Sequence, residues 1–162
     1  MSETINSEIY LELKTFTVNV ISKLYLSKSS QSSKVAVVVF ADSASKRIFC
    51  DQYSSKETIR SAVMAMERGK GVFTNIRDGI VKGGETLQER GCGQRPMTPT
   101  QQVLILISDG RANRGKDGKN GIIQAATELR SRGILMLAVG VGKNYSILFN
   151  FSWDLRERFA IQ

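Results

Sequence analysis

The stretch "VLILISDG", from Val103 to Gly110, constrains the fold of this chain more than any other feature of its sequence. Five apolar residues follow one another without interruption and then give way to a serine, an aspartate and a glycine. An apolar run of this kind predicts a strand that is buried on both faces, as strands are in a parallel sheet covered by helices. Asp109 therefore marks the point at which a buried strand is expected to reach the surface.

Segments of strand type and of helix type alternate along the rest of the chain. Further buried strands are predicted at Val35–Ala41 and Ile134–Gly142, with a short partner strand at Arg47–Cys50. Apolar periodicity and capping signals predict helices at Ile5–Leu24, from a Ser54–Glu57 capping box to about Met66, at Ile76–Glu89 and at Ile122–Gly133. This alternation predicts an α/β fold with a Rossmann-like three-layer α/β/α architecture, in which helices cover both faces of a mostly parallel sheet.

Length and composition limit the class of protein. A chain of 162 residues, 41% of them hydrophobic, has the size of one globular domain. No apolar stretch is long enough to span a bilayer, and the N-terminal "MSETINSEIY" is polar and acidic where a signal peptide is basic and then apolar. We therefore expect neither a membrane span nor a signal peptide in this chain.

The chain contains no histidine, and its two cysteines, Cys50 and Cys92, have no cysteine close to them in sequence. This composition argues against a zinc site, a CxxC redox motif and a catalytic triad based on histidine. For two isolated cysteines we favour free thiols over a disulfide bridge.

The position of Asp109 allows two interpretations. In helix-covered parallel sheets, ligands bind in the crevice beyond the carboxyl ends of the strands, which is where Asp109 is expected to lie. A plain turn also explains "SDG", because Ser, Asp and Gly are common after strands. The spacing alone leaves both interpretations open.

Four segments in a fixed order resemble the von Willebrand factor type A domain: "VAVVVFADSA", a glycine-rich loop with "TN" opening a helix, "VLILISDG", and "AATELRSRGILMLAVGVG". The resemblance implies a type A-like domain at residues 1–142 that lacks its first strand, and a divergent tail at 143–162. Members of this family bind a divalent cation at the top of the sheet, in the metal-ion-dependent adhesion site, and use it to capture an acidic group of a ligand. The resemblance thus implies a non-enzymatic adhesion module of an extracellular protein, with a matrix or cell-surface partner such as collagen.

Carried over by position, the resemblance implies Thr74 and Asp109 as metal ligands, and oxygen ligands of this kind suit Mg²⁺. The family's D-x-S-x-S motif is absent from the sequence. The one near match starts at Asp42, and it places Ala44 and Lys46 at the other two positions, where an ammonium group cannot bind a cation. We therefore expect a degenerate site and no bound cofactor. Mg²⁺ or another divalent cation is expected only if the missing first strand is supplied.

The missing strand also has a mechanical consequence. In this family the first strand lies at the centre of the sheet, between the strands that correspond to Val35–Ala41 and Val103–Ser108. Without it these two strands either pair directly or keep unpaired edges, which are costly when buried and prone to association when exposed. We expect the missing strand to lie upstream of Met1 and the isolated chain to be poorly soluble. Alternatively, the aromatic tail at 143–162 fills part of the core.

The net charge of +8 and the isoelectric point near 9.7 favour anionic partners. Arg111, Arg114, Lys116 and Lys119 crowd the loop after Asp109, and they are candidates for an anion-binding surface that needs no metal and takes a sulfated glycosaminoglycan. A solvated basic loop is the alternative. No aromatic residue interleaves with these charges to stack on bases, so we expect no specific nucleic-acid binding.

An enzyme finds little support in the sequence. Acid–base catalysis requires a positioned partner, and none is identifiable for Asp109. The loop "GKGVFTN" lacks the residue order of a phosphate-binding loop. Type A domains also occur in intracellular assembly proteins, so an intracellular scaffold domain is a further alternative.

Overall fold

The computed structural model describes residues 7–27, 29, 32–68, 73–89, 91–92, 100–108 and 118–140. Within these ranges the element order is α1 (Ser7–Ser22), β1 (Val37–Phe40), β2 (Ala44–Ile48), α2 (Lys56–Met64), α3 (Ile76–Gln88), β3 (Val103–Ser108), α4 (Gly118–Ser131) and β4 (Leu135–Gly140). None of the described helices is both long and apolar enough to cross a membrane.

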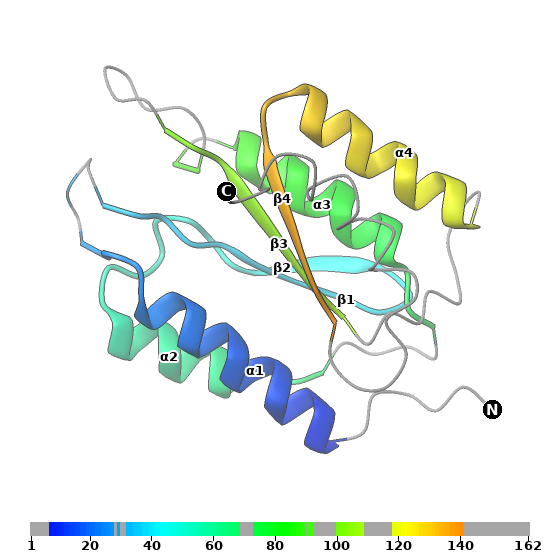
Figure 1. Cartoon of the computed structure of the whole chain (residues 1–162). Coiled ribbons are helices and arrows are strands. Elements are labelled where there is room, and N and C mark those ends of the chain that lie inside the picture. Colours follow the sequence, from blue (N-terminus) through cyan, green and yellow to red (C-terminus); the bar gives the residue numbers. More distant parts are fainter. Residues whose placement is uncertain are drawn as a thin grey trace, which may run out of the picture.

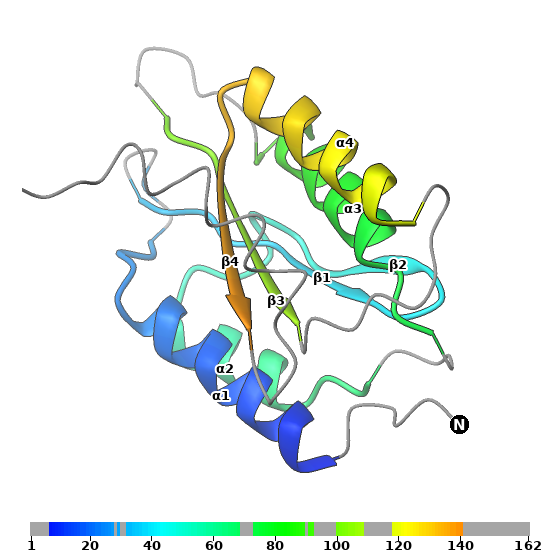
Figure 2. The same cartoon turned by 45° about the vertical axis from the view of Figure 1, so that its right-hand side comes forward.

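The elements form three layers. Helices α1 and α2 lie on one side of the strands, and α3 and α4 lie on the other (Figure 1). The same separation holds when the molecule is turned (Figure 2). The described part of the chain therefore has the predicted α/β/α arrangement.

The described strands belong to two separate two-stranded sheets. Strands β1 and β2 form an antiparallel hairpin, whereas β3 and β4 are parallel and paired from Val103 opposite Leu135 to Ser108 opposite Gly140. No ladder joins β1 to β3 in the described residues. Direct pairing of these two strands, one of the two expected outcomes, is therefore not found among the described residues.

Each pair of helices covers its own apolar core. The core under α3 and α4 includes the buried side chains of Ile80, Leu106 and Leu129, and the core under α1 and α2 includes Ile48 and Ile59. Alternation along the strands explains the division, because successive side chains of a strand point to opposite faces. Both faces of the strand layer are thus apolar. The prediction that the strand from Val103 is buried on both faces is wrong for one face, where Val103 and Ile105 are 38% and 37% exposed.

Helix α3 lies unusually close to its neighbours because of its glycines. A Cβ atom at Gly79 would lie 2.7 Å from the Phe40 ring, and one at Gly83 would lie 2.6 Å from Leu104. Phe40 belongs to β1 and Leu104 to β3, so one face of α3 touches both sheets. These glycines cost some intrinsic helix stability, but they allow the close contact that connects the two sheets.

The start of α2 differs by one residue from the predicted capping box. Ser55, not Ser54, is the N-cap, and its hydroxyl accepts a hydrogen bond from the Thr58 backbone N–H. The Ser55 hydroxyl also donates to the Glu57 carboxylate at 2.8 Å. A backbone hydrogen bond and this hydroxyl together lower the pKa of Glu57. A serine caps the helix as predicted, but the Ser54–Glu57 capping box is wrong, because the N-cap is Ser55 and Glu57 is the second helical residue.

Cys50 and Cys92 form a disulfide, so the expectation of two free thiols was wrong. Their Cα atoms are 5.2 Å apart although their sequence separation is 42. The bridge joins the segment after β2 to the segment after α3, which the fold brings together. Sequence spacing alone carried no information about this distance.

We expect the disulfide to contribute about 3–4 kcal/mol to the free energy of unfolding, from the chain-entropy cost of closing a loop of this length. A Cys50→Ser, Cys92→Ser double variant should be destabilised by that amount in denaturant unfolding. The control is reductant, which should destabilise the parent chain and leave the double variant unchanged. An equal effect of reductant on both proteins would contradict the bridge.

Candidate functional site

The loop that carries Thr74 is fixed to the end of β1. The Asn75 backbone N–H donates to the Ala41 carbonyl at 2.8 Å, and the Phe73 N–H donates to Asp42 Oδ1 at 2.8 Å. Thr74 stands between these two anchored residues and is half-buried. Its backbone is therefore held at the carboxyl end of β1.

The first turn of α3 completes this network. The Asn75 side chain caps the helix by accepting from the Asp78 N–H at 3.1 Å. The Asp78 carboxylate in turn accepts from the Ala44 N–H at the start of β2. Two carboxylates near Thr74, those of Asp42 and Asp78, are thus used to join the β1–β2 turn to α3.

Thr74 and Ser108 line the same cavity, which lies between β1 and β3. Ser108 is the last residue of β3 and is buried, with only 2% of its surface exposed. Asp109 follows it directly and lies outside the described residues. The approach of Asp109 to Thr74 therefore stays a prediction.

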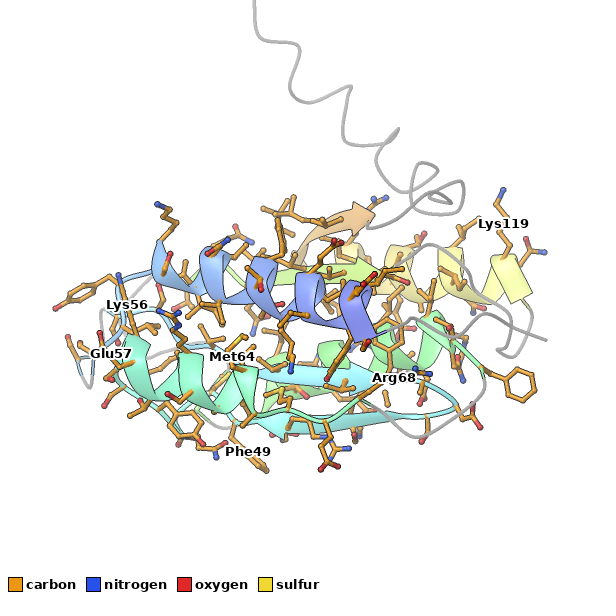
Figure 3. All side chains as sticks on the ribbon, turned by 90° about the horizontal axis from the view of Figure 1, so that it is seen from below. Phe49, Lys56, Glu57, Met64, Arg68 and Lys119 are labelled. Carbon is orange, nitrogen blue, oxygen red and sulfur yellow. A yellow bond between two sulfur atoms is a disulfide. The ribbon has the colours of Figure 1, made fainter. Side chains whose placement is uncertain are left out.

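One member of the predicted basic cluster is described. Lys119 lies in the first turn of α4 and is exposed. Figure 3 shows it at the outer end of that helix, pointing away from the strands. Arg111, Arg114 and Lys116 lie outside the described residues, so the cluster as a whole stays a prediction.

The described residues around Thr74 do not fit a divalent cation. They offer one neutral hydroxyl, while both nearby carboxylates already accept backbone hydrogen bonds. Among the described residues no group of three or more acidic, cysteine or histidine side chains could hold a metal ion. Mg²⁺ requires a near-octahedral set of oxygen ligands, which a single hydroxyl does not supply.

Sequence reasoning missed the role of Asp42. It was weighed only as a metal ligand, whereas the structure uses it to hold the Thr74 loop. The nearest signal in the sequence is the spacing of Asn75 and Asp78, which is that of an N-cap and its third helical residue. That signal marks the helix start, but it gives no information on a contact between the loop and a distant turn.

Comparison with known proteins identifies the family. The model of the von Willebrand factor type A domain matches residues 1–147. The chain belongs to this family. The predicted fold class and the resemblance stated from the four sequence segments are both confirmed.

Similar proteins include two collagen chains and a matrilin of Mus musculus. The chain is 26% identical to the collagen alpha-6(VI) chain over 141 residues and 30% identical to the collagen alpha-5(VI) chain over 151 residues. It is 26% identical to matrilin-2 over 143 residues. These alignments cover 87–88% of this chain but only 6%, 5% and 14% of those proteins, respectively.

Solved structures show the same fold. Proximal thread matrix protein 1 from the mussel byssus, with a zinc-occupied adhesion motif, superimposes with a TM-score of 0.73 at 23% identity, covering 86% of this chain and 34% of that one. The manganese-loaded TRAP protein of Plasmodium vivax gives a TM-score of 0.72 at 19% identity, covering 92% of this chain and 57% of that one. At these identities the likeness establishes the fold alone.

Millimolar Mg²⁺ or Mn²⁺ should leave the melting temperature of this chain unchanged, because an ion that does not bind the native state cannot shift its unfolding. The measurement is thermal unfolding across a cation titration, with Thr74→Ala as the matched control. A saturable rise in melting temperature that Thr74→Ala or Asp109→Asn removes would show that the chain holds a working site.

Asp42→Ala should release the Thr74 loop, because it removes the acceptor of the Phe73 N–H. One exposed hydrogen bond contributes about 1 kcal/mol, so amide exchange at Phe73 should quicken about fivefold. Asp42→Asn keeps a side-chain oxygen and should exchange almost as slowly as the parent. Equal exchange in all three proteins would contradict this role of Asp42.

Proposed function

We propose that this chain is a non-enzymatic adhesion module that binds an extracellular-matrix or cell-surface protein such as collagen. The observation that carries the proposal is the type A family match over residues 1–147, with relatives among collagen VI chains and matrilin. Within the described residues, the Thr74 loop at the carboxyl end of β1 is the part of the proposed binding site that can be located. Because the chain spans a small part of these relatives, its partner is inferred from the family and not from their full-length functions.

An extracellular location fits the disulfide. Bridges such as Cys50–Cys92 persist in oxidising compartments and are rare in the cytosol, where thiols are kept reduced. This observation favours the matrix interpretation over the intracellular scaffold.

The cation site of this module is proposed to be degenerate. Thr74 and Asp109 are the ligands that the sequence retains, and the D-x-S-x-S motif that would complete them is absent. When bound in a complete site, Mg²⁺ would supply a coordination position for an acidic group of the ligand. In this chain Thr74 and Asp109 would only shape the edge of the cavity.

The non-enzymatic assignment rests on the same geometry. The carboxylates of Asp42 and Asp78 accept backbone N–H groups and hold a loop, which is a structural task. General acid–base catalysis needs a proton-transfer group within hydrogen-bond reach of a substrate and paired with a second one. The described residues around Thr74 present no such pair.

A second candidate is an anion-binding surface at Arg111, Arg114, Lys116 and Lys119. The exposed position of Lys119 and the net charge of +8 favour it. Sulfates of a glycosaminoglycan are the ligand class, because such a cluster supplies charge without the aromatic platforms that nucleic acids use. This candidate needs no metal and is compatible with an adhesion role.

The adhesion proposal can be tested by supplying the absent motif. An apolar strand ending in D-x-S-x-S, fused upstream of Met1, should create Mg²⁺-dependent binding to immobilised collagen that EDTA removes. Thr74→Ala in the fused protein should abolish that binding, and a fused strand ending in A-x-A-x-A is the matched control. Collagen binding that is equal with and without the motif, and that EDTA does not reduce, would contradict the proposed site.

The anion candidate predicts retention on heparin that falls steeply with salt. Replacing the four basic residues by serine should lower the salt concentration needed for elution. The control replaces four lysines and arginines outside the loop, Lys14, Lys23, Arg60 and Arg132, with the same change in net charge. An equal fall in the eluting salt concentration in the two variants would favour the alternative, that the loop is a solvated basic surface.

A further inference from the structure

The side chain of Arg77, in the first turn of α3, carries a charge that the described residues do not balance. Its Nε atom is buried and has no hydrogen-bond acceptor, and no ion pair or ring contact of the guanidinium occurs among the described residues. The residue as a whole is half-buried, and its two outer nitrogens are not among the buried atoms that lack a partner. The outer end of the guanidinium is therefore open to an external ligand.

The position of Arg77 is unfavourable for a cation. The first turn of a helix is its positive pole, and a donor that loses water without gaining an acceptor costs free energy. The neighbouring Asp78 does not compensate, because its carboxylate accepts a hydrogen bond from the Ala44 N–H on β2. A partly desolvated, unpaired charge is stabilised when an anion binds it. Arg77 is thus costly to the fold and well suited to an anionic ligand.

Helices α3 and α4 run in the same direction and lie side by side (Figure 1 and Figure 2). Both end next to Gln102, just before β3. Its Nε2 donates to the Leu87 carbonyl in the last turn of α3 at 2.6 Å, and its carbonyl accepts from the Leu135 N–H, shortly after α4, at 2.9 Å. Because both helices end at the amino end of β3, their first turns are neighbours at the opposite, carboxyl edge of the strands.

The packing of the two helices places Arg77 at the start of the seam between them. Further along, a Cβ atom at Gly84 would overlap the Leu129 side chain of α4, so these two residues mark the line of contact. Arg77 and Ile122 each stand seven residues earlier, which is nearly two helical turns and returns to about the same face. Ile122 is buried, with 2% of its surface exposed. The stem of Arg77 therefore lies on the buried side of α3, in agreement with its covered Nε.

A second unpaired cation lies at the start of the same seam. Lys119 is exposed in the first turn of α4, three residues before Ile122, and its ammonium makes no hydrogen bond or ion pair among the described residues. The first turn of α4 contains no acidic residue. Packed helices lie about 8–10 Å apart, a distance that the long side chains of arginine and lysine span. Each helix thus contributes one cation to this place.

We propose that Arg77 and Lys119 form a sulfate-binding subsite at the start of the α3–α4 seam, and that its ligand is a sulfated polysaccharide. A guanidinium is weakly hydrated and holds oxyanions through paired hydrogen bonds. A polymer with repeated sulfates contacts both cations at once, whereas a single carboxylate of a protein partner contacts one. The proposal rests on the anion-binding candidate described above, and it adds to Lys119 a residue outside the predicted basic cluster.

Heparin binding of the full chain tests the subsite. Arg77→Met keeps an apolar stem and removes the charged fork, so the dissociation constant should rise about fivefold, with Arg77→Lys between it and the parent. The matched control is Arg60→Met, which makes the same change in net charge at an exposed position of α2, on the other side of the strands. Lys119→Met should weaken binding more than this control does.

Thermal unfolding separates a binding role of Arg77 from a structural one. Because the guanidinium is unpaired and opposes the helix dipole, Arg77→Met should keep a melting temperature at or above that of the parent when no ligand is present. Heparin should raise the melting temperature of the parent more than that of the variant. A clear fall in the melting temperature of Arg77→Met without heparin would identify a structural arginine and overturn the proposal.

The remaining outcomes separate the subsite from the anion-binding candidate. If Arg77→Met binds heparin like Arg60→Met while serine at Arg111, Arg114 and Lys116 weakens binding, the subsite is wrong and the candidate stands. If all of these variants lose affinity equally, both are wrong. Desulfated heparin should bind more weakly than heparin. Equal binding of the two, or Arg77-dependent binding of polyglutamate but not of heparin, would overturn sulfate as the ligand and assign a carboxylate.

Discussion

The close packing of α3 against both two-stranded sheets is the contact on which the rest of this structure depends. The described strands make no ladder between β1 and β3. The hairpin and the parallel pair are instead connected through their shared contacts with α3. Gly79 and Gly83, four residues apart on α3, let Phe40 and Leu104 approach its backbone. Larger residues at these positions would push the sheets away from the helix and from each other.

Helix α3 also connects the core to the loop that carries Thr74. Its first turn, through Asn75 and Asp78, holds the β1–β2 turn, and Asp42 in that turn holds the loop before the helix. These contacts fix the backbone on both sides of Thr74. The Thr74 loop is therefore held by protein contacts alone.

The sequence predicted the architecture well because buried strands and amphipathic helices leave strong local patterns. The run from Val103 to Ser108 and the helix start at Ile76 fall where the patterns placed them. Contacts between distant segments left no such signal. The Cys50–Cys92 bridge and the hydrogen bond from Phe73 to Asp42 depend on distances that only the folded chain sets. The assignment of Asp109 is supported by the family pattern, and that of the basic loop after it by clustered charge in the sequence.

The disulfide has a consequence for a protein held under tension. Cys50 follows the hairpin and Cys92 follows α3, so a pull along the chain passes through the bridge and bypasses the segment between them, over which the sequence separation is 42. At about 3.4 Å per extended residue, roughly 140 Å of chain is withheld from stretching. Helices α2 and α3 thus stay within a closed loop when the flanking elements are drawn apart. The length by which this segment can extend under load therefore depends on whether Cys50 and Cys92 are oxidised or reduced.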